Sequence, residues 1–346
     1  MWSIISQAFP PAPNITEDTI PDLHGKVSTK PPKPFAGYNR SPVYQVYIVT
    51  GSNVGVGKEV ARILYSKHAK VYVAARSAEK AKDAIDAIKA LHTDAKGELF
   101  FLRLDLADLT TIKQSAEEFL SKESKLHVLF NNAGVMTPPQ GSVTAQGYEL
   151  QLGVNNIGTF MFTKLLTPLL AKTAGSEPAG TVRVVWVSST AAENASRNPG
   201  GVPIDELDDY QHEKKWRFYR YGFSKAGNYL HAVEYAKRHR EDGIVSIPLN
   251  PGNLDSELYR GFNPLIRGVL RRTVLHPAVY GAYTELFAGL STEVTMEKSG
   301  SWVVPWGRFM DIRRDLVEAT KAEAEGGTGV GKRFWEWTEA QIKPYL

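Results

Sequence analysis

Short apolar segments alternate with amphipathic segments from residue 46 onward, and this alternation decides which folds are open to the chain. The apolar segments are uninterrupted, so each strand is expected to be buried on both faces, as in a parallel sheet. They are YIVT (47–50), VYVAAR (71–76), LFFLRLDL (99–106), LHVLFNN (126–132), VRVVWVSS (182–189) and IVSIPLNP (244–251). In the segment between the first two, Val60, Ile63 and Leu64 are spaced three or four residues apart, which predicts a helix with one apolar face.

This pattern predicts an α/β fold with a doubly wound parallel sheet, the Rossmann fold, as a single domain. We assign residues 46–310 to that domain, residues 1–45 to an N-terminal extension and residues 311–346 to a C-terminal helical tail. At 346 residues, length alone would also allow two domains, but one α/β unit of this size is common. In such sheets ligands bind beyond the carboxyl ends of the strands, so the loops after the strands are the candidates for chemistry.

Composition narrows the class of ligand. A net charge of +4 is too small to indicate nucleic acid, so a small molecule is the expected partner. There is no cysteine, which excludes disulfides and thiolate metal sites, and none of the eight histidines forms a ligand pair, so no metal site is expected. No apolar run approaches the roughly 20 residues that span a bilayer, and no signal peptide is recognisable, so we expect a cytoplasmic protein. The oligomeric state is left open.

A glycine-rich segment, TGSNVGVG (50–57), lies directly between the first strand and the first helix. Gly51, Gly55 and Gly57 allow a tight turn and a close approach of the backbone to a pyrophosphate, whose charge would meet the positive end of the helix. A second glycine segment, GGTGVGK (326–332), does not qualify, because Arg333 stands where a phosphate loop needs Ser or Thr and no buried strand precedes it. We interpret it as a hinge before a helix that begins at Phe334.

The end of the second strand favours NADP(H) over NAD(H). A carboxylate about 20 residues beyond the glycine segment would bind the ribose hydroxyls of NAD. Here Ala74 and Ala75 occupy that strand end and Arg76 follows. A guanidinium can bind a 2′-phosphate in a forked geometry, and Lys80 is a second candidate cation nearby.

Catalytic candidates follow the later strands. Tyr221 and Lys225 in YGFSK are four residues apart at the start of a predicted helix, so their side chains lie on one face. A tyrosine has a reference pKa near 10, and a neighbouring positive charge favours its phenolate. Ser188 and Ser189 end the fifth strand, where a hydroxyl can hold a substrate oxygen. Asn155 lies in the helix that follows NNAG (131–134).

This set of motifs resembles the short-chain dehydrogenase/reductase family over about residues 46 to 306. The motifs are TGSNVGVG, NNAG, Asn155 in NxxG, VSS, YGFSK and NPGNLDS. The long interval from serine to tyrosine, the AARS strand end and the SKAGN helix resemble the retinol-dehydrogenase-like branch, especially fungal members that begin MWS and end in a tail containing WGR.

The resemblance implies roles for individual residues. Tyr221 would donate or accept the proton, and Lys225 would activate Tyr221 and bind the nicotinamide ribose. Ser189 would position the reacting oxygen, whereas Ser188 would be structural. Asn155 would hold a water that relays protons. Residues 251–254 would lie near the carboxamide, and Ser256 replaces the usual threonine while keeping its hydroxyl. The full cofactor-binding set would be Gly51, Ser52, Asn53, Gly55, Val56, Gly57, Arg76, Asp105, Leu106, Asn132, Tyr221, Lys225, Leu254 and Ser256.

The implied reaction is hydride transfer between NADP(H) and the carbonyl or alcohol of a small molecule. Residues 255–276 would form a flap over the substrate, and their apolar residues indicate a lipophilic one. The arginines of this segment could face acidic substituents or an anionic membrane surface, or the segment is a packed surface helix with a solvated basic face. The alternative function is a dinucleotide-binding regulator or pseudoenzyme on the same fold, against which the intact Ser189, Tyr221 and Lys225 argue.

The N-terminal extension contains a family-like strand entry, HGKV (24–27), that is cut off from the first strand. Removing residues 27–45 gives DLHGKVYIVTGSNVGVG, which resembles the uninterrupted entry of the family. Two hypotheses remain: a retained in-frame intron bounded by GT and AG, and a proline-rich surface loop. Either way we expect the strand to begin at Val46, residues 28–44 to be poorly ordered and the active site to assemble at the opposite end of the sheet.

Overall fold

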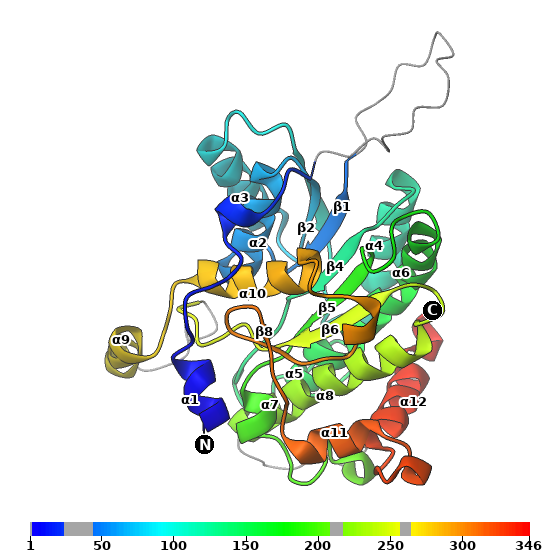
Figure 1. Cartoon of the computed structure of the whole chain (residues 1–346). Coiled ribbons are helices and arrows are strands. Elements are labelled where there is room, and N and C mark those ends of the chain that lie inside the picture. The colour runs from blue at the N-terminus through cyan, green and yellow to red at the C-terminus, as the bar shows by residue number, and fades with distance from the viewer. Residues whose placement is uncertain (1, 24–43, 208–216, 257–263) are drawn as a thin grey trace.

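The computed structural model describes residues 2–23, 44–207, 217–256 and 264–346, with side chains described for these residues other than 2–4 and 264–267. A sheet of eight strands in the order β3-β2-β1-β4-β5-β6-β7-β8 forms the centre of this part of the chain (Figure 1). Each neighbouring pair from β3 to β7 is parallel, and β8 pairs antiparallel with β7. The doubly wound parallel sheet is confirmed, and β8 is an antiparallel addition that was not predicted.

The strands end close to where the apolar segments predicted. They are β1 Val46–Thr50, β2 Lys70–Ala75, β3 Glu98–Arg103, β4 Val128–Asn131, β5 Arg183–Val187, β6 Val245–Leu249, β7 Val303–Val304 and β8 Arg308–Phe309. Every residue of β1, β4, β5 and β6 is buried, as an uninterrupted apolar segment indicates. In β3 the expectation of burial on both faces was wrong, because β3 is the edge strand and leaves Phe100 39% exposed.

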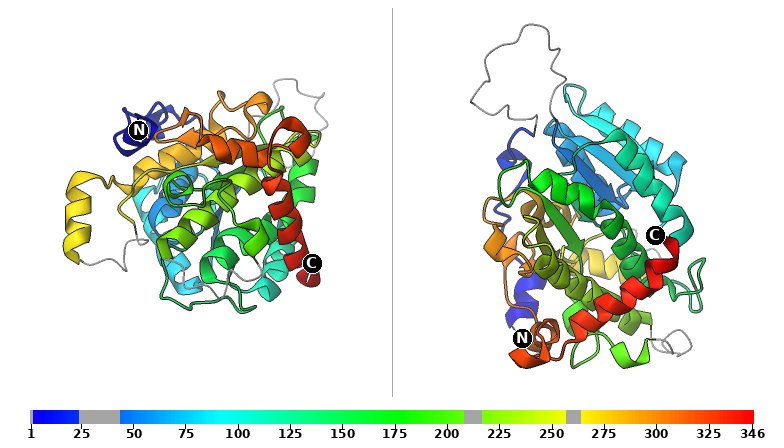
Figure 2. Two further views of the ribbon diagram at one scale, coloured as in Figure 1. Left: turned by 90° about the horizontal axis from the view of Figure 1, so that it is seen from below. Right: turned by 90° about the vertical axis from the view of Figure 1, so that its right-hand side faces the viewer.

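Helices cover both faces of the sheet (Figure 2). On one face α2 Gly55–Ser66, α3 Ala78–Leu91 and α10 Ala278–Leu290 contribute to a buried cluster with residues of the sheet. On the other face α4 Leu109–Lys122, α6 Thr159–Ala174 and α8 Arg217–Arg238 form a second cluster. The sheet therefore lies between two hydrophobic layers, which leaves its strand ends as the place where a ligand can bind.

Shorter elements complete the described chain. They are α1 Trp2–Ala8, α5 Leu150–Leu152, a π-helical segment Gly153–Gly158, α7 Ala191–Asn194, α9 Pro264–Thr273, α11 Arg314–Thr320, α12 Val330–Ile342 and single 3-10 turns at Glu17–Thr19, Ile204–Glu206, Met296–Lys298, Glu323–Glu325 and Lys343–Tyr345. None of the helices in the described ranges is long and apolar enough to cross a membrane.

The C-terminal tail packs onto the second layer. Phe334 of α12 stacks on His231 of α8 with 4.5 Å between ring centroids, and both residues are fully buried. The predicted hinge at residues 326–332 was partly wrong, because α12 begins at Val330. Gly329 precedes it in a left-handed conformation with φ 64°, so the turn occupies only the first part of the glycine segment.

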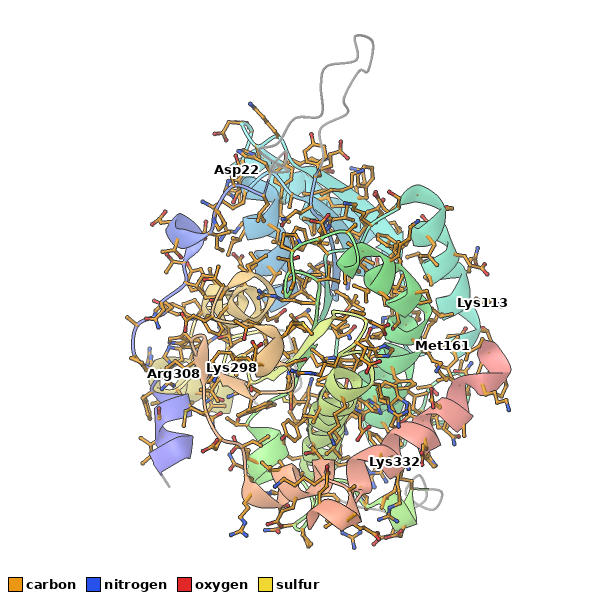
Figure 3. The ribbon with its side chains drawn as sticks, turned by 45° about the vertical axis from the view of Figure 1, so that its right-hand side comes forward. Asp22, Lys113, Met161, Lys298, Arg308 and Lys332 are labelled. Carbon is orange, nitrogen blue, oxygen red and sulfur yellow. The ribbon has the colours of Figure 1, made fainter. Side chains whose placement is uncertain are left out.

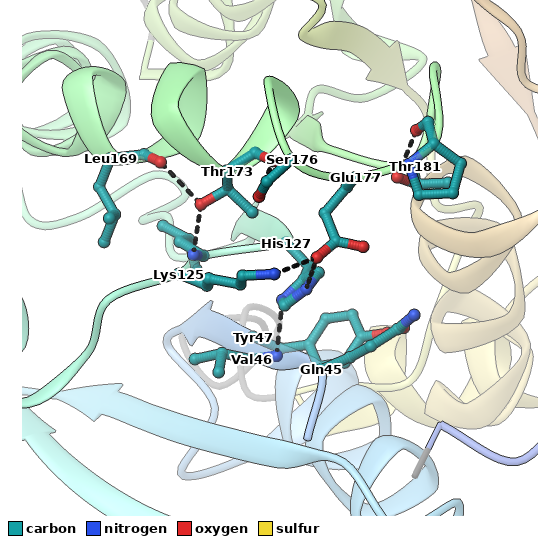
Figure 4. A network of polar contacts seen from close by, with 12 residues as sticks. Gln45, Val46, Tyr47, Lys125, His127, Leu169, Thr173, Ser176, Glu177 and Thr181 are labelled. Carbon is teal, nitrogen blue, oxygen red and sulfur yellow. Dashed lines mark hydrogen bonds and ion pairs between the residues drawn. The ribbon is translucent and has the colours of Figure 1, made fainter. Parts of the chain in front are cut away.

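The first strand begins at Val46, as predicted, and its entrance is held by polar contacts (Figure 4). Val46 N donates to His127 Nδ1 at 2.9 Å, and His127 N donates to Val46 O at 2.9 Å. Just upstream, Gln45 N lies 3.5 Å from Leu23 O, so these two residues lie next to each other at the entrance of the first strand. The prediction for residues 28–44 lies outside the described residues apart from Tyr44.

Candidate cofactor and catalytic site

The glycine segment after β1 has the backbone that its sequence requires. Gly51 has φ 68°, and a Cβ at Gly57 would lie 2.4 Å from Asn132 Nδ2. Asn132 comes from the end of β4 and donates from Nδ2 to Thr50 O at 2.7 Å, which ties the glycine turn to the neighbouring strand end. Ser52 is buried and donates to Val49 O at 2.6 Å, so its hydroxyl stabilises the turn itself.

A hollow of about 330 Å³ opens at the N-terminus of α2. It is lined by Asn53, Val54, Gly55, Lys58, Asp255, Ser256 and Arg271. Four of these residues follow β1 and the other three follow β6, so two distant segments meet here. Val56 points elsewhere, since its side-chain carbons lie 3.2 Å from where a Cβ on Gly281 of α10 would be.

The hollow has features that attract an anion. The first amide groups of a helix have no acceptor inside the helix, and Lys58 and Arg271 add positive charge to the positive helix end. Arg271 Nε forms an ion pair with Asp255 Oδ2 at 2.7 Å, which joins α9 to the loop after β6 and offsets part of the positive charge of Arg271. Lys58 and Arg271 were missing from the predicted cofactor set. Lys58 could have been found from its place directly after the last glycine, whereas Arg271 is brought here only by the tertiary fold.

The predicted adenine-side residues follow β2 and β3. Arg76 is exposed at the end of β2 and, within the described ranges, has no ion-pair partner. Asp105 accepts a hydrogen bond from Ala107 N at 3.0 Å, and Leu106 beside it is buried. These residues are not among those that line the hollow.

Tyr221 and Lys225 occupy successive turns of α8, and both are buried. Lys225 Nζ lies 5.7 Å from the centroid of the Tyr221 ring and donates to Val187 O, at the end of β5, at 2.8 Å. Ser188 Oγ donates to Lys225 O at 2.6 Å, so the strand end and the helix are joined on both sides of the lysine. Ser189 is partly exposed and accepts a hydrogen bond from Ala191 N at 3.1 Å.

Asn155 is fully buried in the π-helical segment and lies beside the same lysine. Its Oδ1 accepts from Val135 N at 2.8 Å, and its Nδ2 donates to Ser224 Oγ at 2.9 Å. A Cβ on Gly134 would lie 3.2 Å from Asn155 Oδ1 and 3.3 Å from Lys225 Nζ. The missing side chain at Gly134 therefore lets these two polar groups approach one another.

Glu285 of α10 is a charged residue that the sequence analysis did not single out. It is fully buried, and within the described part of the chain neither carboxyl oxygen has a hydrogen-bond partner. Burial raises the pKa of Glu285 to about 8, while the positive charge of Lys225 acts in the opposite direction. Burial also lowers the pKa of Lys225 to about 8, opposed by Glu285. Glu285 lies between Gly281 and Gly289 at a four-residue spacing, which is the signal that could have placed it on the buried face.

Leu254 and Ser256 follow β6 and lie at the carboxyl edge of the sheet, near the glycine turn. Leu254 is buried and pairs with His276, and the Ser256 Cβ lies 3.7 Å from where a Cβ on Gly55 would be. The fold thus brings Asn53, Gly55 and Ser256 to the hollow, and Asn155, Tyr221 and Lys225 to a second group. Both groups lie at the carboxyl edge of the sheet.

A Rossmann-type sheet with a glycine turn after β1 and a tyrosine–lysine pair beside β5 defines a class of dinucleotide-binding oxidoreductases. A family model described as short chain dehydrogenase matches residues 45–200. A short-chain dehydrogenase/reductase from Phomopsis amygdali is 52% identical over 345 residues, which cover 99% of this chain and 96% of that protein. One from Neocamarosporium betae is 48% identical over 349 residues, covering 100% of this chain and 94% of the relative.

The chain therefore belongs to the short-chain dehydrogenase/reductase family, a family of oxidoreductases. Among solved structures, an NADPH-bound carbonyl reductase from chicken fatty liver superimposes with a TM-score of 0.58. It is 21% identical and covers 77% of this chain and 98% of its own, so the likeness concerns the fold. Placement in the retinol-dehydrogenase-like branch stays a prediction.

Proposed function

We propose that the chain is an NADP(H)-dependent oxidoreductase that transfers a hydride between nicotinamide and the carbonyl or alcohol of a lipophilic small molecule. The observation that carries this proposal is the grouping of Asn155, Tyr221 and Lys225 at the same sheet edge as the glycine turn. The division into an N-terminal extension, a catalytic domain at 46–310 and a helical tail is part of the same proposal.

The cofactor would supply the hydride, and the protein residues would align and protonate the substrate. Tyr221 is the proposed proton donor for reduction and acceptor for oxidation. Lys225 holds a positive charge beside it, because an amine with a pKa of about 8 is largely protonated at neutral pH. That charge favours the phenolate of Tyr221. Ser189 would hold the substrate oxygen, and the space beside Gly134 would admit a water between Asn155 and Lys225.

The hollow at α2 would hold the pyrophosphate through Asn53, Gly55, Lys58 and Arg271, with Ser256 and Leu254 toward the nicotinamide end. Arg76 would bind the 2′-phosphate, and its lack of an ion-pair partner within the described ranges supports this role. A carboxylate at Ala74 or Ala75 would repel that phosphate, and neither position carries one. This combination supports NADP(H) as the preferred cofactor.

A lipophilic substrate is inferred from the apolar residues of 255–276, of which residues 257–263 lie outside the described ranges. A cytoplasmic location is part of the same proposal. The alternative function is a regulator that binds the dinucleotide without turnover.

The test is a comparison of the unmodified protein with Tyr221→Phe and a matched control, Tyr229→Phe, which alters a buried tyrosine two turns along the same helix. NADPH and NADH oxidation are followed with aliphatic, aromatic, steroid and polyketide carbonyls. We expect Tyr221→Phe to lower kcat by about a hundredfold or more, because a positioned general acid contributes that much, while NADPH binding is unchanged. Equal turnover in both variants would remove Tyr221 from the mechanism, and NADPH binding without any turnover in the unmodified protein would favour a regulator.

A further inference from the structure

The N-terminal helix α1 lies at the same edge of the sheet as the proposed catalytic group (Figure 1). Its residue Gln7 is 1% exposed, although it comes from a seven-residue helix near the start of the chain. A buried amide at the end of an extension is unexpected unless its hydrogen-bonding groups have partners in the body of the protein. Both ends of the Gln7 amide have such partners.

The side chain of Gln7 connects two loops by a directional series of hydrogen bonds. Gln7 Nε2 donates to Glu193 Oε2 at 2.8 Å, and Gln7 Oε1 accepts from Asn250 Nδ2 at 2.9 Å. Asn250 Oδ1 in turn accepts from Gly252 N at 3.1 Å. The orientation is self-consistent, because the backbone N–H of Gly252 can only donate, so the amides of Asn250 and Gln7 must face the way they do.

The two ends of this series border the proposed substrate and nicotinamide positions. Glu193 lies on α7, whose first turn is held by the Ser189 hydroxyl through its bond from Ala191 N. Gly252 lies two residues before Leu254, which is the residue expected near the carboxamide. A change at Gln7 therefore reaches the loop after β5 and the loop after β6 at once.

Neighbouring contacts fix α1 in this position. Arg308 of β8 donates from its two terminal nitrogens to Ser6 Oγ at 2.9 Å and to Ser6 O at 2.8 Å, and it lies beside α1 in Figure 3. His276 Nε2 lies 3.4 Å from Ala8 O, while His276 N donates to Asn253 O at 2.8 Å. The residues before and after Gln7 are thus held by different parts of the molecule, so the Gln7 side chain is not free to move away.

We propose that Gln7 is a positioning residue for the reaction, and that α1 holds the loops after β5 and β6 so that Ser189 and Leu254 meet substrate and cofactor in the reactive geometry. This inference rests on the proposed function, because it assigns Gln7 a place in that same site. It predicts that the N-terminal helix matters more for turnover than for binding of the dinucleotide, because the glycine turn lines most of the hollow and only Asp255 and Ser256 come from the loop that Gln7 holds.

The test uses the full chain with Gln7→Leu, which keeps the size but removes both hydrogen bonds, and Gln7→Ala. Ile5→Ala is the control, because Ile5 lies on the same helix but is 50% exposed. Hydrogen exchange of residues 189–196 and 250–256 is measured without substrate, together with kcat, KM, the Kd of NADPH and Tm. We expect faster exchange in both segments and a kcat lower by about tenfold to a hundredfold in the Gln7 variants, because small misplacements of reacting groups cost this much. The Kd of NADPH should change less than kcat in the Gln7 variants, and the Ile5→Ala variant should show the exchange and the kcat of the unmodified protein.

Unchanged exchange in Gln7→Leu would overturn the proposal, and so would faster exchange with an unchanged kcat. An equal effect of Ile5→Ala would also overturn it, since the effect would then belong to the helix and not to the Gln7 side chain. If the unmodified protein reduces no carbonyl, the proposed function fails, whereas the exchange measurement still decides whether Gln7 holds the two loops.

Discussion

Arg76 carries the cofactor preference in this proposal, and it does so from the exposed end of β2 without an ion-pair partner within the described ranges. A charge-assisted hydrogen bond contributes about 1.5–3 kcal/mol. We expect Arg76→Leu to raise the Kd of NADPH roughly tenfold or more while leaving the Kd of NADH unchanged. Lys82→Leu is the control, since Lys82 is an exposed cation on the neighbouring helix that pairs with Asp86. An equal loss for both cofactors would refute the assignment to the 2′-phosphate.

Glu285 gives the protein a pH dependence that can be isolated. Its pKa is about 8 in the folded protein instead of 4.5, so between these values the folded state holds a proton that the unfolded chain releases. The contribution of Glu285 to stability is therefore expected to fall as pH rises from about 4.5 to about 8. Above that range the lowered pKa of Lys225 works in the other direction, because the unfolded chain then holds the extra proton.

We expect the free energy of unfolding of Glu285→Gln to rise relative to that of the unmodified protein as the pH goes from about 5 to about 8, because the amide has no proton to lose. Urea denaturation across this range measures the effect, and Glu79→Gln, at an exposed position of α3, controls for loss of a carboxylate. Parallel pH profiles for the unmodified protein and Glu285→Gln would show that the Glu285 carboxyl ionises normally.

At the scale of single residues, the sequence predicted side chains that follow a strand or share a helical turn. Tyr221 and Lys225 could be paired because four residues make about one turn, and Asn132 could be placed because it ends an apolar segment. Arg271 and Gln7 could not, because their roles depend on segments that meet only after folding, whereas Lys58 was overlooked although it directly follows the last glycine of the turn. Glu285 was missed for a different reason: an isolated glutamate in a helix is usually exposed, so nothing but its spacing from two glycines marks it as buried.

Among the elements, α12 is docked on α8 through a histidine that must stay neutral. Burial lowers the pKa of His231 to about 3. Thr338 Oγ1 donates to Phe334 O at 2.7 Å, so at the 3.0 Å contact His231 Nε2 is the donor and Thr338 Oγ1 the acceptor. Between about pH 3 and 6.5 the unfolded chain takes up a proton that the folded protein excludes, so stability falls as the pH is lowered.

The expected loss from His231 is about 2 kcal/mol at about pH 5. His231→Phe keeps an aromatic ring against Phe334 and should show a smaller acid loss in urea denaturation. The same substitution at partly exposed His239 controls for removal of an imidazole. A variant that loses as much stability in acid as the unmodified protein would show that another group controls the acid response.

Elements were predictable where they are long and apolar. The six predicted strands lie within two residues of their observed starts, whereas β7 and β8 have two residues each and carry no periodic signal. The start of α12 was placed too late because glycine was taken as a helix breaker, although Gly331 lies in its first turn. Packing of the tail against the buried core overrides that local preference.

For the whole molecule, the segment between Leu23 and Gln45 is the clearest subject for a deletion. The two residues that flank this segment lie next to each other, because Gln45 N is in hydrogen-bond contact with Leu23 O. Removing residues 27–45 joins residues 24–26 directly to Val46. Shortening the loop from about 20 residues to about three lowers its closure cost, so we expect a gain of about 1.5 kcal/mol in the free energy of unfolding.

Urea denaturation and turnover of the deletion variant measure this gain, and turnover should be unchanged because the segment enters at the amino end of the sheet. An insoluble or less stable variant would mean that residues 27–45 contribute contacts of their own. Comparing transcript with genomic DNA addresses the separate question of a retained intron, and a transcript pool that always contains the segment would count against it.

The adjacency of Leu23 and Gln45 also makes this position a natural grafting point. A second folded domain whose own termini lie close together could replace the intervening residues without pulling the strand entrance apart. Such a graft would stand at the far end of the sheet from Tyr221, Lys225 and the glycine turn. A fluorescent or affinity domain placed there would report on the enzyme, or fix it to a surface, while the loops after β5 and β6 stay open to solution.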